Sequence, residues 1–136
     1  MAINKQLYER IVAAKLFMDN HYQMPLQLEQ ISQSAFLSPF HFHRLFKKVY
    51  RKTPHQYLTT KRLEKAKDLL TENHGVSEVC AEVGFESLGS FSVLFKKEIG
   101  FAPQYYRNMA WLKKQKAKKQ PRSVIPHCFI ESFRLD

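Results

Sequence analysis

Residues 29–57 read EQISQSAFLSPFHFHRLFKKVYRKTPHQY, and residues 78–106 read EVCAEVGFESLGSFSVLFKKEIGFAPQYY. Aligned with an offset of 49, the two stretches are identical at ten of 29 positions, where ordinary residue frequencies give about two by chance. The identities include a serine, three phenylalanines and a Lys-Lys pair at matching places. Because solenoids need about three or more repeats to be stable, two copies indicate a tandem duplication instead.

Each copy is predicted to contain two helices joined by a tight turn, in which Ala35-Phe36 takes the place of Gly84-Phe85. The second helix begins at Ser38 or Ser87, and serine is a favoured N-cap. A short helix followed by one with a basic outer face is the helix-turn-helix arrangement. An ordinary helical hairpin has the same spacing, but the duplication with matched Lys-Lys pairs favours the helix-turn-helix. The core-facing residues at helical spacing are Phe42, Leu45, Phe46 and Val49, and Phe91, Leu94 and Phe95.

Helical periodicity continues on both sides of the first copy. One helix is predicted before residue 20 and another over 54–74, with Asn73-His74-Gly75 as the stop. About 19 residues of continuous helix span about 28 Å, close to the ~34 Å between successive major-groove segments on one face of DNA. One chain could therefore present both helix-turn-helix motifs to an asymmetric site as a monomer.

The sequence predicts an all-α chain with four regions. Its tail contains KKQKAKKQPR, predicted to be a flexible basic arm, and VIPHCFIESF, which has enough apolar residues to form a short strand or to dock on the domain. The regions are a helix-turn-helix subdomain at 1–53, a linker helix at 54–74, a second helix-turn-helix subdomain at 75–111 and a basic tail at 112–136.

The chain is strongly basic, with 22 Lys and Arg against 12 Asp and Glu and a formal net charge of +10. This balance indicates a polyanionic partner, either nucleic acid or an anionic membrane, although a solvated surface would also account for it. No apolar run approaches the ~20 residues that span a bilayer, and no secretory-signal pattern is present. Cys80 and Cys128 are too few for a disulfide framework and fit a reducing cytoplasm. Cys80 aligns with Ile31 and is predicted to lie in the core.

Residues 28–107 resemble the DNA-binding domain of the AraC/XylS family of bacterial transcription regulators. The resemblance rests on RLFKK, TP..YL...RL..A..LL and GFES...F...FKK..G..P..YR. It implies about seven helices, two helix-turn-helix subdomains and a rigid linker helix. It also implies a cytoplasmic, nucleoid-associated regulator with no enzymatic activity, cofactor or metal, similar to short stand-alone members that bind promoters as monomers. The implied partners are double-stranded DNA and RNA polymerase, which the family contacts to activate transcription.

By this resemblance, the outward positions early in the first recognition helix contact DNA bases. Those positions hold Phe40, His43 and Arg44. Arg44 can make a bidentate contact to guanine, His43 can donate to a base acceptor, and Phe40 can pack on a thymine methyl group. The residues predicted to contact phosphates are Ser38, Lys47, Lys48, Ser87, Lys96 and Lys97.

The second recognition helix carries no charged residue at its base-facing positions. Base contacts are implied for Ser90 and Val93, and Val93 occupies the position of Arg44. This helix is therefore expected to contribute phosphate contacts and groove-shape recognition rather than base choice. Arg51 replaces the glycine found at Gly100, so the ends of the two recognition helices are expected to differ. The full base-facing set is Leu88, Gly89, Ser90, Ser92 and Val93.

Two pairs of side chains suggest other chemistry. His41 and His43, both expected to face outward, have a spacing found in some zinc sites, but no Cys or acid lies near them, so no metal is predicted. His127-Cys128 invites comparison with a nucleophilic site, and an enzyme acting on DNA is the rival function, which Cys128→Ser would test. A membrane or protein-interaction module would show no preference for a promoter over random duplex DNA.

Overall fold

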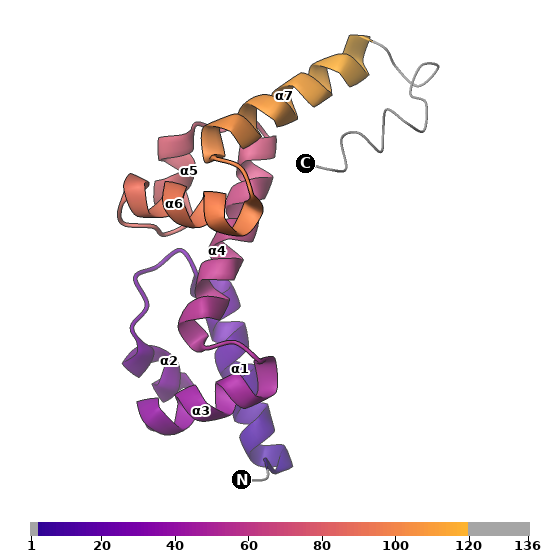
Figure 1. The fold of residues 1–136 in the computed structure, drawn as a ribbon. Helices are drawn as coiled ribbons and strands as arrows, with labels where there is room; N and C mark the ends of the chain where they lie inside the picture. Colours follow the sequence, from indigo (N-terminus) through magenta and orange to yellow (C-terminus); the bar gives the residue numbers. More distant parts are fainter. Residues whose placement is uncertain (1–2, 120–136) are drawn as a thin grey trace. The chain divides into compact units, whose positions relative to one another are not determined.

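The computed structural model describes residues 3–119, and within that range the regular structure is entirely helical (Figure 1). The predicted all-α class is confirmed. The strand considered for residues 124–133 lies outside the described residues. No helix in the described range is long and apolar enough to cross a membrane. The helices are α1 (Lys5–His21), α2 (Leu28–Ser34), α3 (Pro39–Tyr50), α4 (Pro54–Thr71), α5 (Val76–Glu82), α6 (Leu88–Ile99) and α7 (Pro103–Lys119).

Local sequence signals set the helix ends. The Asn4 side chain accepts a hydrogen bond from the backbone N–H of Leu7 at 2.8 Å and caps α1. Helices α3, α4 and α7 each begin at a proline, whose fixed φ suits the first helical turn. Helix α4 ends at Thr71, just before Asn73, which has a left-handed backbone with φ 69°. The predicted stop is confirmed.

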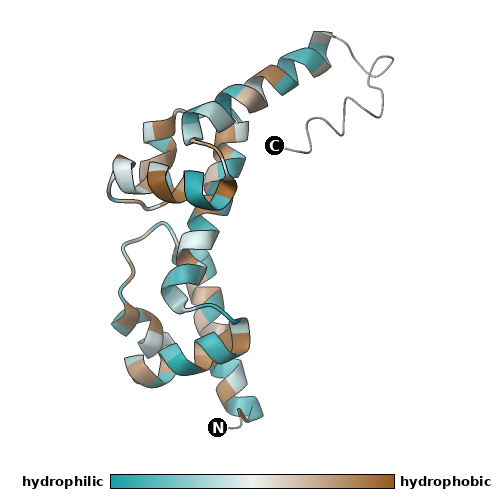
Figure 2. Cartoon of the chain, in the orientation of Figure 1, coloured by the Kyte–Doolittle hydropathy of each residue, from teal (hydrophilic) through white to brown (hydrophobic). Residues whose placement is uncertain are grey.

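The chain divides into two compact units inside α4, between Lys65 and Ala66. Figure 2 shows hydrophobic and hydrophilic residues alternating along the helices, as expected when one face of a helix packs on a core. The core of the first unit includes Ile11, Met18, Phe42, Leu45 and Phe46. The buried residues of the second unit include Leu70, Val79, Val83, Phe91 and Phe95.

The duplicated aromatic residues pack in the same way in both units. Phe46 meets Tyr57 edge-on, with ring centroids 5.6 Å apart and an interplanar angle of 72°. Phe95 meets Tyr106 with centroids 5.5 Å apart at 71°. The two copies therefore share side-chain packing between the recognition helix and the helix that follows it.

The first helices of the two copies match with an offset of 48 rather than 49. Phe36 donates its N–H to the carbonyl of Gln33, as Gly84 does to the carbonyl of Ala81. Both residues are left-handed, with φ 56° at Phe36 and 98° at Gly84. The turn after α5 holds one more residue before its serine cap, because Ser38 and Ser87 still differ by 49. The expected pairings of Ala35-Phe36 with Gly84-Phe85 and of Ile31 with Cys80 are wrong for this reason.

Replacing Phe36 with glycine is expected to raise the free energy of unfolding by about 1 kcal/mol. A left-handed backbone strains a residue that carries a Cβ, and glycine relieves the strain. The Phe36 side chain is 81% exposed, so its removal opens no cavity. Gly84→Ala should lower stability by a similar amount. Urea unfolding measures both changes, and a lower midpoint for Phe36→Gly would contradict the strain.

Two expectations about helix ends are wrong. Helices α3 and α6 end alike, because Arg51 (φ 64°) and Gly100 (φ 100°) both adopt the left-handed conformation and donate their N–H to the carbonyls of Lys47 and Lys96. Helix α7 includes residues 112–119, so this part of the tail is helical rather than a flexible arm. Its Leu, Lys, Gln and Ala residues are all good helix formers. The boundaries of the four regions stay predictions.

Sequence reasoning missed two arginines that hold interhelical loops. Arg62 on α4 donates from Nε to the carbonyl of Tyr22 at 2.6 Å and from a terminal nitrogen to that of Met24 at 2.9 Å. Arg107 on α7 binds the carbonyls of Asn73-His74 in the same way, at 3.1 and 2.9 Å. Each arginine satisfies loop carbonyls that follow a helix. The two arginines do not align by sequence, so identity alone does not reveal this shared feature.

A carboxylate network joins α1 to α4 in the first unit. The Tyr57 hydroxyl donates to Asp19 Oδ1 at 2.5 Å, and Lys15 Nζ lies 2.9 Å from Asp19 Oδ2. Partial burial acts to raise the pKa of Asp19, but the hydrogen bonds from Tyr57 and Lys15 outweigh it and hold that pKa below its usual value. Burial and the bond to Asp19 raise the pKa of Tyr57, so its hydroxyl remains a donor at neutral pH.

The first unit is therefore expected to lose stability in acid. Because the pKa of Asp19 is lower in the folded than in the unfolded chain, its contribution is present above about pH 4 and is lost as the pH falls through the folded value. Asp19→Asn should cost about 1.5 kcal/mol at pH 7 and should reduce the further loss on acidification. Urea unfolding at pH 7 and pH 3 measures both. An unchanged acid sensitivity in the variant would contradict the role of Asp19.

Candidate nucleic-acid interface

Helices α3 and α6 begin with equivalent serine caps at the surface. Ser38 Oγ accepts from the backbone N–H of His41 at 3.2 Å, and Ser87 Oγ accepts from that of Ser90 at 2.9 Å. Both serines are exposed, and each hydroxyl keeps its own hydrogen for an outside acceptor. The N-terminus of a helix favours a nearby anion through its N–H groups and its dipole. This geometry is compatible with the phosphate contacts predicted for both serines.

Phe40 and Arg44 form one exposed pair on the outer face of α3. Phe40 is 72% exposed, and Arg44 Cζ lies 5.7 Å from the centroid of its ring. The i, i+4 spacing puts the two side chains side by side, and the ring attracts the guanidinium by a cation–π interaction. An arginine held this way loses less side-chain freedom when it binds a partner. The structure thus brings together two of the three base-contacting residues predicted on α3.

The third residue, His43, lies apart from this pair. It is half-buried and lines a pocket of about 220 Å³ with His55 and apolar side chains of α2 and α4. The expectation that His41 faces outward is wrong for its ring, because Nε2 is buried and has no hydrogen-bond partner within residues 3–119. Residues four apart share a helix face, and His41 therefore lies beside the buried Leu45. Fewer side chains of α3 are fully exposed than predicted.

The Lys-Lys pairs lie in the last turns of α3 and α6. A lysine there also benefits the helix itself, since the C-terminus of a helix carries partial negative charge. The phosphate-contacting role stays a prediction, which the salt dependence of binding can test. The four exposed residues are Lys47, Lys48, Lys96 and Lys97.

The start of α6 presents small and apolar residues. Val93, at the position of Arg44, is 68% exposed, and Ser90 is exposed as well. A Cβ added at Gly89 would lie 3.8 Å from Ser87 Oγ, an ordinary contact, so a side chain would fit there. The sequence therefore leaves this surface without charged groups although there is room for them, in keeping with a smaller part in base choice.

The remaining candidate residues lie outside α3 and α6. His127 and Cys128 lie outside the described residues, as does the end of the basic stretch. Cys80 is buried as predicted, and burial raises the pKa of its thiol, which disfavours the reactive thiolate. Within residues 3–119, no group of three or more His, Cys, Asp or Glu side chains is placed to hold a metal ion.

Comparison with known proteins places this fold among helix-turn-helix proteins. A family model described as a helix-turn-helix domain matches residues 31–109. The probable transcriptional regulator LumQ of Photobacterium leiognathi is 34% identical over 110 residues, which are 79% of this chain and 44% of LumQ. The bifunctional transcriptional activator/DNA repair enzyme AdaA of Bacillus subtilis is 32% identical over 95 residues, 69% of this chain and 45% of AdaA. The DNA-binding domain of AdpA, a global transcriptional factor solved with a target DNA, shares the fold with a TM-score of 0.70 at 24% identity, over 83% of this chain and 97% of that domain.

The chain belongs to the AraC family of helix-turn-helix transcription regulators. It spans about half the length of the curated relatives described above. The predicted family is confirmed, whereas the individual DNA-contacting residues stay predictions.

Proposed function

We propose that this chain binds an asymmetric, sequence-specific site on double-stranded DNA through α3 and α6 and thereby regulates transcription, chiefly as an activator. The observation that carries the proposal is the exposed Phe40–Arg44 pair on α3. The duplicated packing of the two units and the net charge of +10 support it.

Arg44 is the principal base-reading residue in this proposal. Its guanidinium can donate two parallel hydrogen bonds to O6 and N7 of a guanine in the major groove. The ring of Phe40 lies beside it and offers an apolar surface to the methyl group of a neighbouring thymine. The pair would then select a base-pair step in which a thymine adjoins a guanine. His43 would donate a hydrogen bond to an acceptor on a neighbouring base.

Selection of bound fragments from random duplex DNA tests this function. The expected result is one half-site with a fixed guanine beside a thymine and a second half-site with weaker base preference. Replacing that thymine by uracil removes one methyl group and should weaken binding about fourfold, because a buried methyl is worth about 0.8 kcal/mol. The same replacement in the DNA should leave the affinity of the Phe40→Ala variant unchanged. Selection that enriches no motif would reject sequence-specific binding.

Lys47→Ala should reduce the slope of log affinity against log salt concentration by about one unit. It should weaken binding to the selected site and to random DNA by the same factor, because a phosphate contact carries no base information. Lys5→Ala, which removes an exposed lysine of α1, is the matched control and should leave the slope unchanged. Equal slopes for the three proteins would remove Lys47 from the interface.

The proposal includes one chain per DNA site and contact with RNA polymerase. Sedimentation of the complex should give one chain per duplex, and purified polymerase should transcribe more from a promoter carrying the selected site. DNA recovered from the complex should be chemically unchanged, and Cys128→Ser should bind it normally. Chemical repair of DNA that Cys128→Ser abolishes would favour an enzyme instead.

A further inference from the structure

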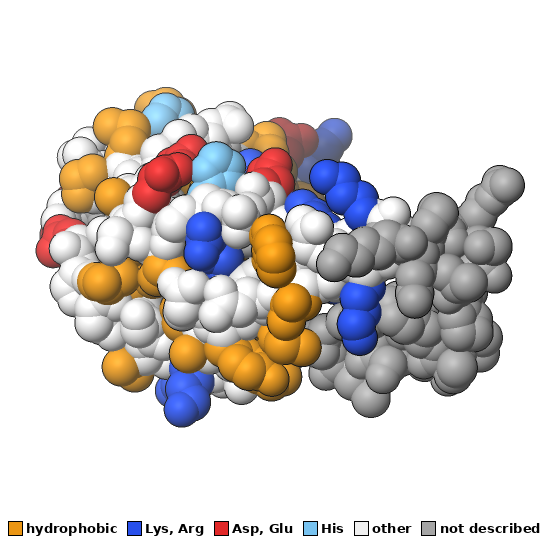
Figure 3. Space-filling model, turned by 90° about the horizontal axis from the view of Figure 1, so that it is seen from above, with side chains coloured by type: hydrophobic (Ala, Val, Ile, Leu, Met, Phe, Trp, Pro, Cys, Tyr) orange, Lys and Arg blue, Asp and Glu red, His pale blue; other side chains and the backbone are white. Residues whose placement is uncertain are grey.

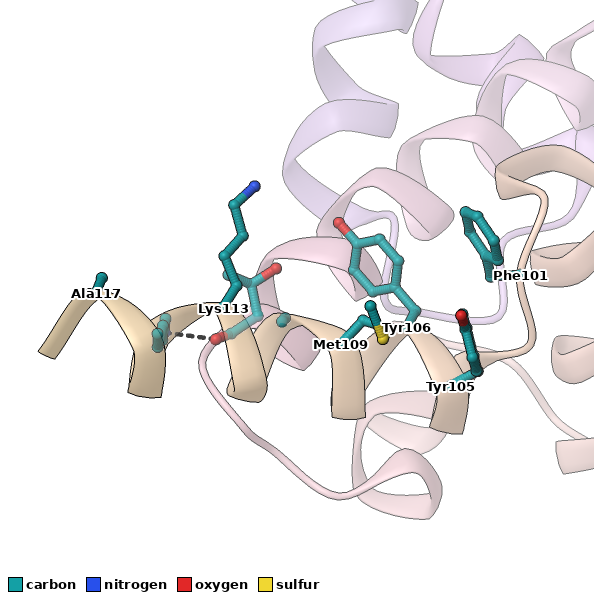
Figure 4. Close-up of a pocket in the computed structure, with 9 residues that line it drawn as sticks. Phe101, Tyr105, Tyr106, Met109, Lys113 and Ala117 are labelled. Carbon is teal, nitrogen blue, oxygen red and sulfur yellow. Dashed lines mark hydrogen bonds between the residues drawn. The ribbon is translucent and has the colours of Figure 1, made fainter. Parts of the chain in front are cut away.

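The second unit carries an apolar pocket along α7. It has a volume of about 410 Å³ and is lined by α7, the end of α4 and the loop before α7. Phe101, Tyr105, Tyr106 and Met109 gather at one end, and Lys113 lies further along the helix (Figure 4). The rings of Phe101 and Tyr105 stack with centroids 5.3 Å apart. On the face seen in Figure 3, hydrophobic side chains likewise form a band with Lys and Arg side chains near it.

The first copy has polar residues at the positions where the second copy has these apolar ones, and it still packs. Helix α4 and the loop before it match α7 and its loop with an offset of 49, because Tyr57 and Tyr106 occupy equivalent places. Lys52 Nζ donates to Thr60 Oγ1 at 3.3 Å, so polar side chains bond one another along this face of the first copy. The packing that the two copies share therefore does not require apolar residues at these positions. The matched residues are Lys52, Gln56 and Thr60 in the first copy and Phe101, Tyr105 and Met109 in the second.

The charge at the pocket also differs between the copies. Lys113 stands where the first copy has Glu64. Lys114 lies on the rim and donates from Nζ to the carbonyl of Thr71, the bond dashed in Figure 4. The second copy thus combines an apolar wall with a positive rim. An occupant that complements both has an apolar body and a negative charge.

We propose that this pocket binds an amphipathic monocarboxylate, with its apolar chain against Tyr105 and Met109 and its carboxylate facing Lys113. The pocket volume lies in the range of ~300–1,000 Å³ that is usual for small-molecule sites. Tyr106 forms part of the wall and also packs on Phe95 of α6, so a bound ligand would touch the residue that anchors α6. The proposal does not depend on the DNA-binding function, because its test uses the protein alone.

Titration of the full chain with sodium decanoate, below its micelle concentration, tests the site by NMR of ¹³C-methyl methionine. The Met109 methyl signal should shift and saturate, because Met109 lines the pocket. Met18 and Met24, in the first unit, should not shift. Decanol has the same chain without the charge and should bind about two- to fivefold more weakly. Decyltrimethylammonium, with the opposite charge, should bind more weakly still.

Two variants install the residues of the first copy at the pocket. Lys113→Glu and Tyr105→Gln should each weaken decanoate binding about fivefold, in proteins that remain folded at the temperature of the titration. Lys116→Glu, the same charge change outside the pocket lining, should have no effect. The proposal is overturned by a Met109 signal that does not saturate, by equal binding of the three probes, or by equal effects of Lys113→Glu and Lys116→Glu. Contacts between the Met109 methyl and residues 120–136 in the free protein would also overturn it, because the chain itself would then fill the pocket.

Discussion

Phe46→Ala should lower the free energy of unfolding by about 3–5 kcal/mol, a large part of the stability of a small domain. Phe46 is fully buried, and its ring contacts those of Phe42, Tyr50 and Tyr57 with centroids 5.5, 4.8 and 5.6 Å away. Alanine leaves a cavity among rings that cannot fully collapse into it. Urea unfolding followed by circular dichroism measures the loss, and DNA binding should fail at temperatures where the variant unfolds.

Phe40→Ala is the matched control, because it makes the same change on the exposed face of the same helix. It should alter stability by less than about 0.5 kcal/mol while weakening DNA binding. Phe95→Ala should reproduce the loss of Phe46→Ala in the second unit, since Phe95 is buried against Phe91 and Tyr106. If the Phe40 and Phe46 variants lost equal stability, the assignment of one to the surface and one to the core would be wrong.

Arg44→Ala should reduce the preference for the selected DNA over a site with its guanine replaced by about 1–3 kcal/mol, or roughly 5- to 150-fold. The reason is the loss of two directed donors held beside the ring of Phe40. Competition binding at one salt concentration, with selected, substituted and random duplexes, measures this preference separately from overall affinity.

Arg44→Lys separates base reading from charge. Lysine keeps the positive charge but lacks the planar pair of donors, so it should retain most affinity for random DNA and lose most discrimination. A comparable loss of affinity on selected and random DNA for Arg44→Ala would instead show that Arg44 only contacts phosphate.

Much of the fold could be predicted because its signals are local. Proline at the start of α3, α4 and α7, serine caps at Ser38 and Ser87, and the left-handed Asn73 each act within one turn of helix. The pairing of Phe40 with Arg44 follows from i, i+4 spacing in the same way. The sequence analysis predicted the two residues as base contacts but did not predict their contact with each other, which the spacing already indicated.

Two kinds of error arose because the side chains of the two copies were taken as a guide to their backbones. Identity matched Phe36 with Phe85, but the backbone matches Phe36 with Gly84, because a turn is defined by its φ angles and hydrogen bonds rather than by its side chains. Glycine at Gly100 likewise suggested a different helix end, yet Arg51 adopts the same left-handed conformation. The identity of a side chain alone does not show that its backbone adopts a strained left-handed conformation.

The amino-acid sequence by itself determined the helices, their order, the duplication and the buried stripe of each recognition helix, since periodicity and capping act over about four residues. Only the tertiary structure decided that Tyr57 meets Asp19, 38 residues away, and that Arg62 holds the carbonyl of Tyr22, 40 residues away. It also decided that Nε2 of His41 is buried and that α7 lines an apolar pocket. These features depend on how helices cross, and crossing is set by the packing of many side chains at once rather than by any one stretch of chain.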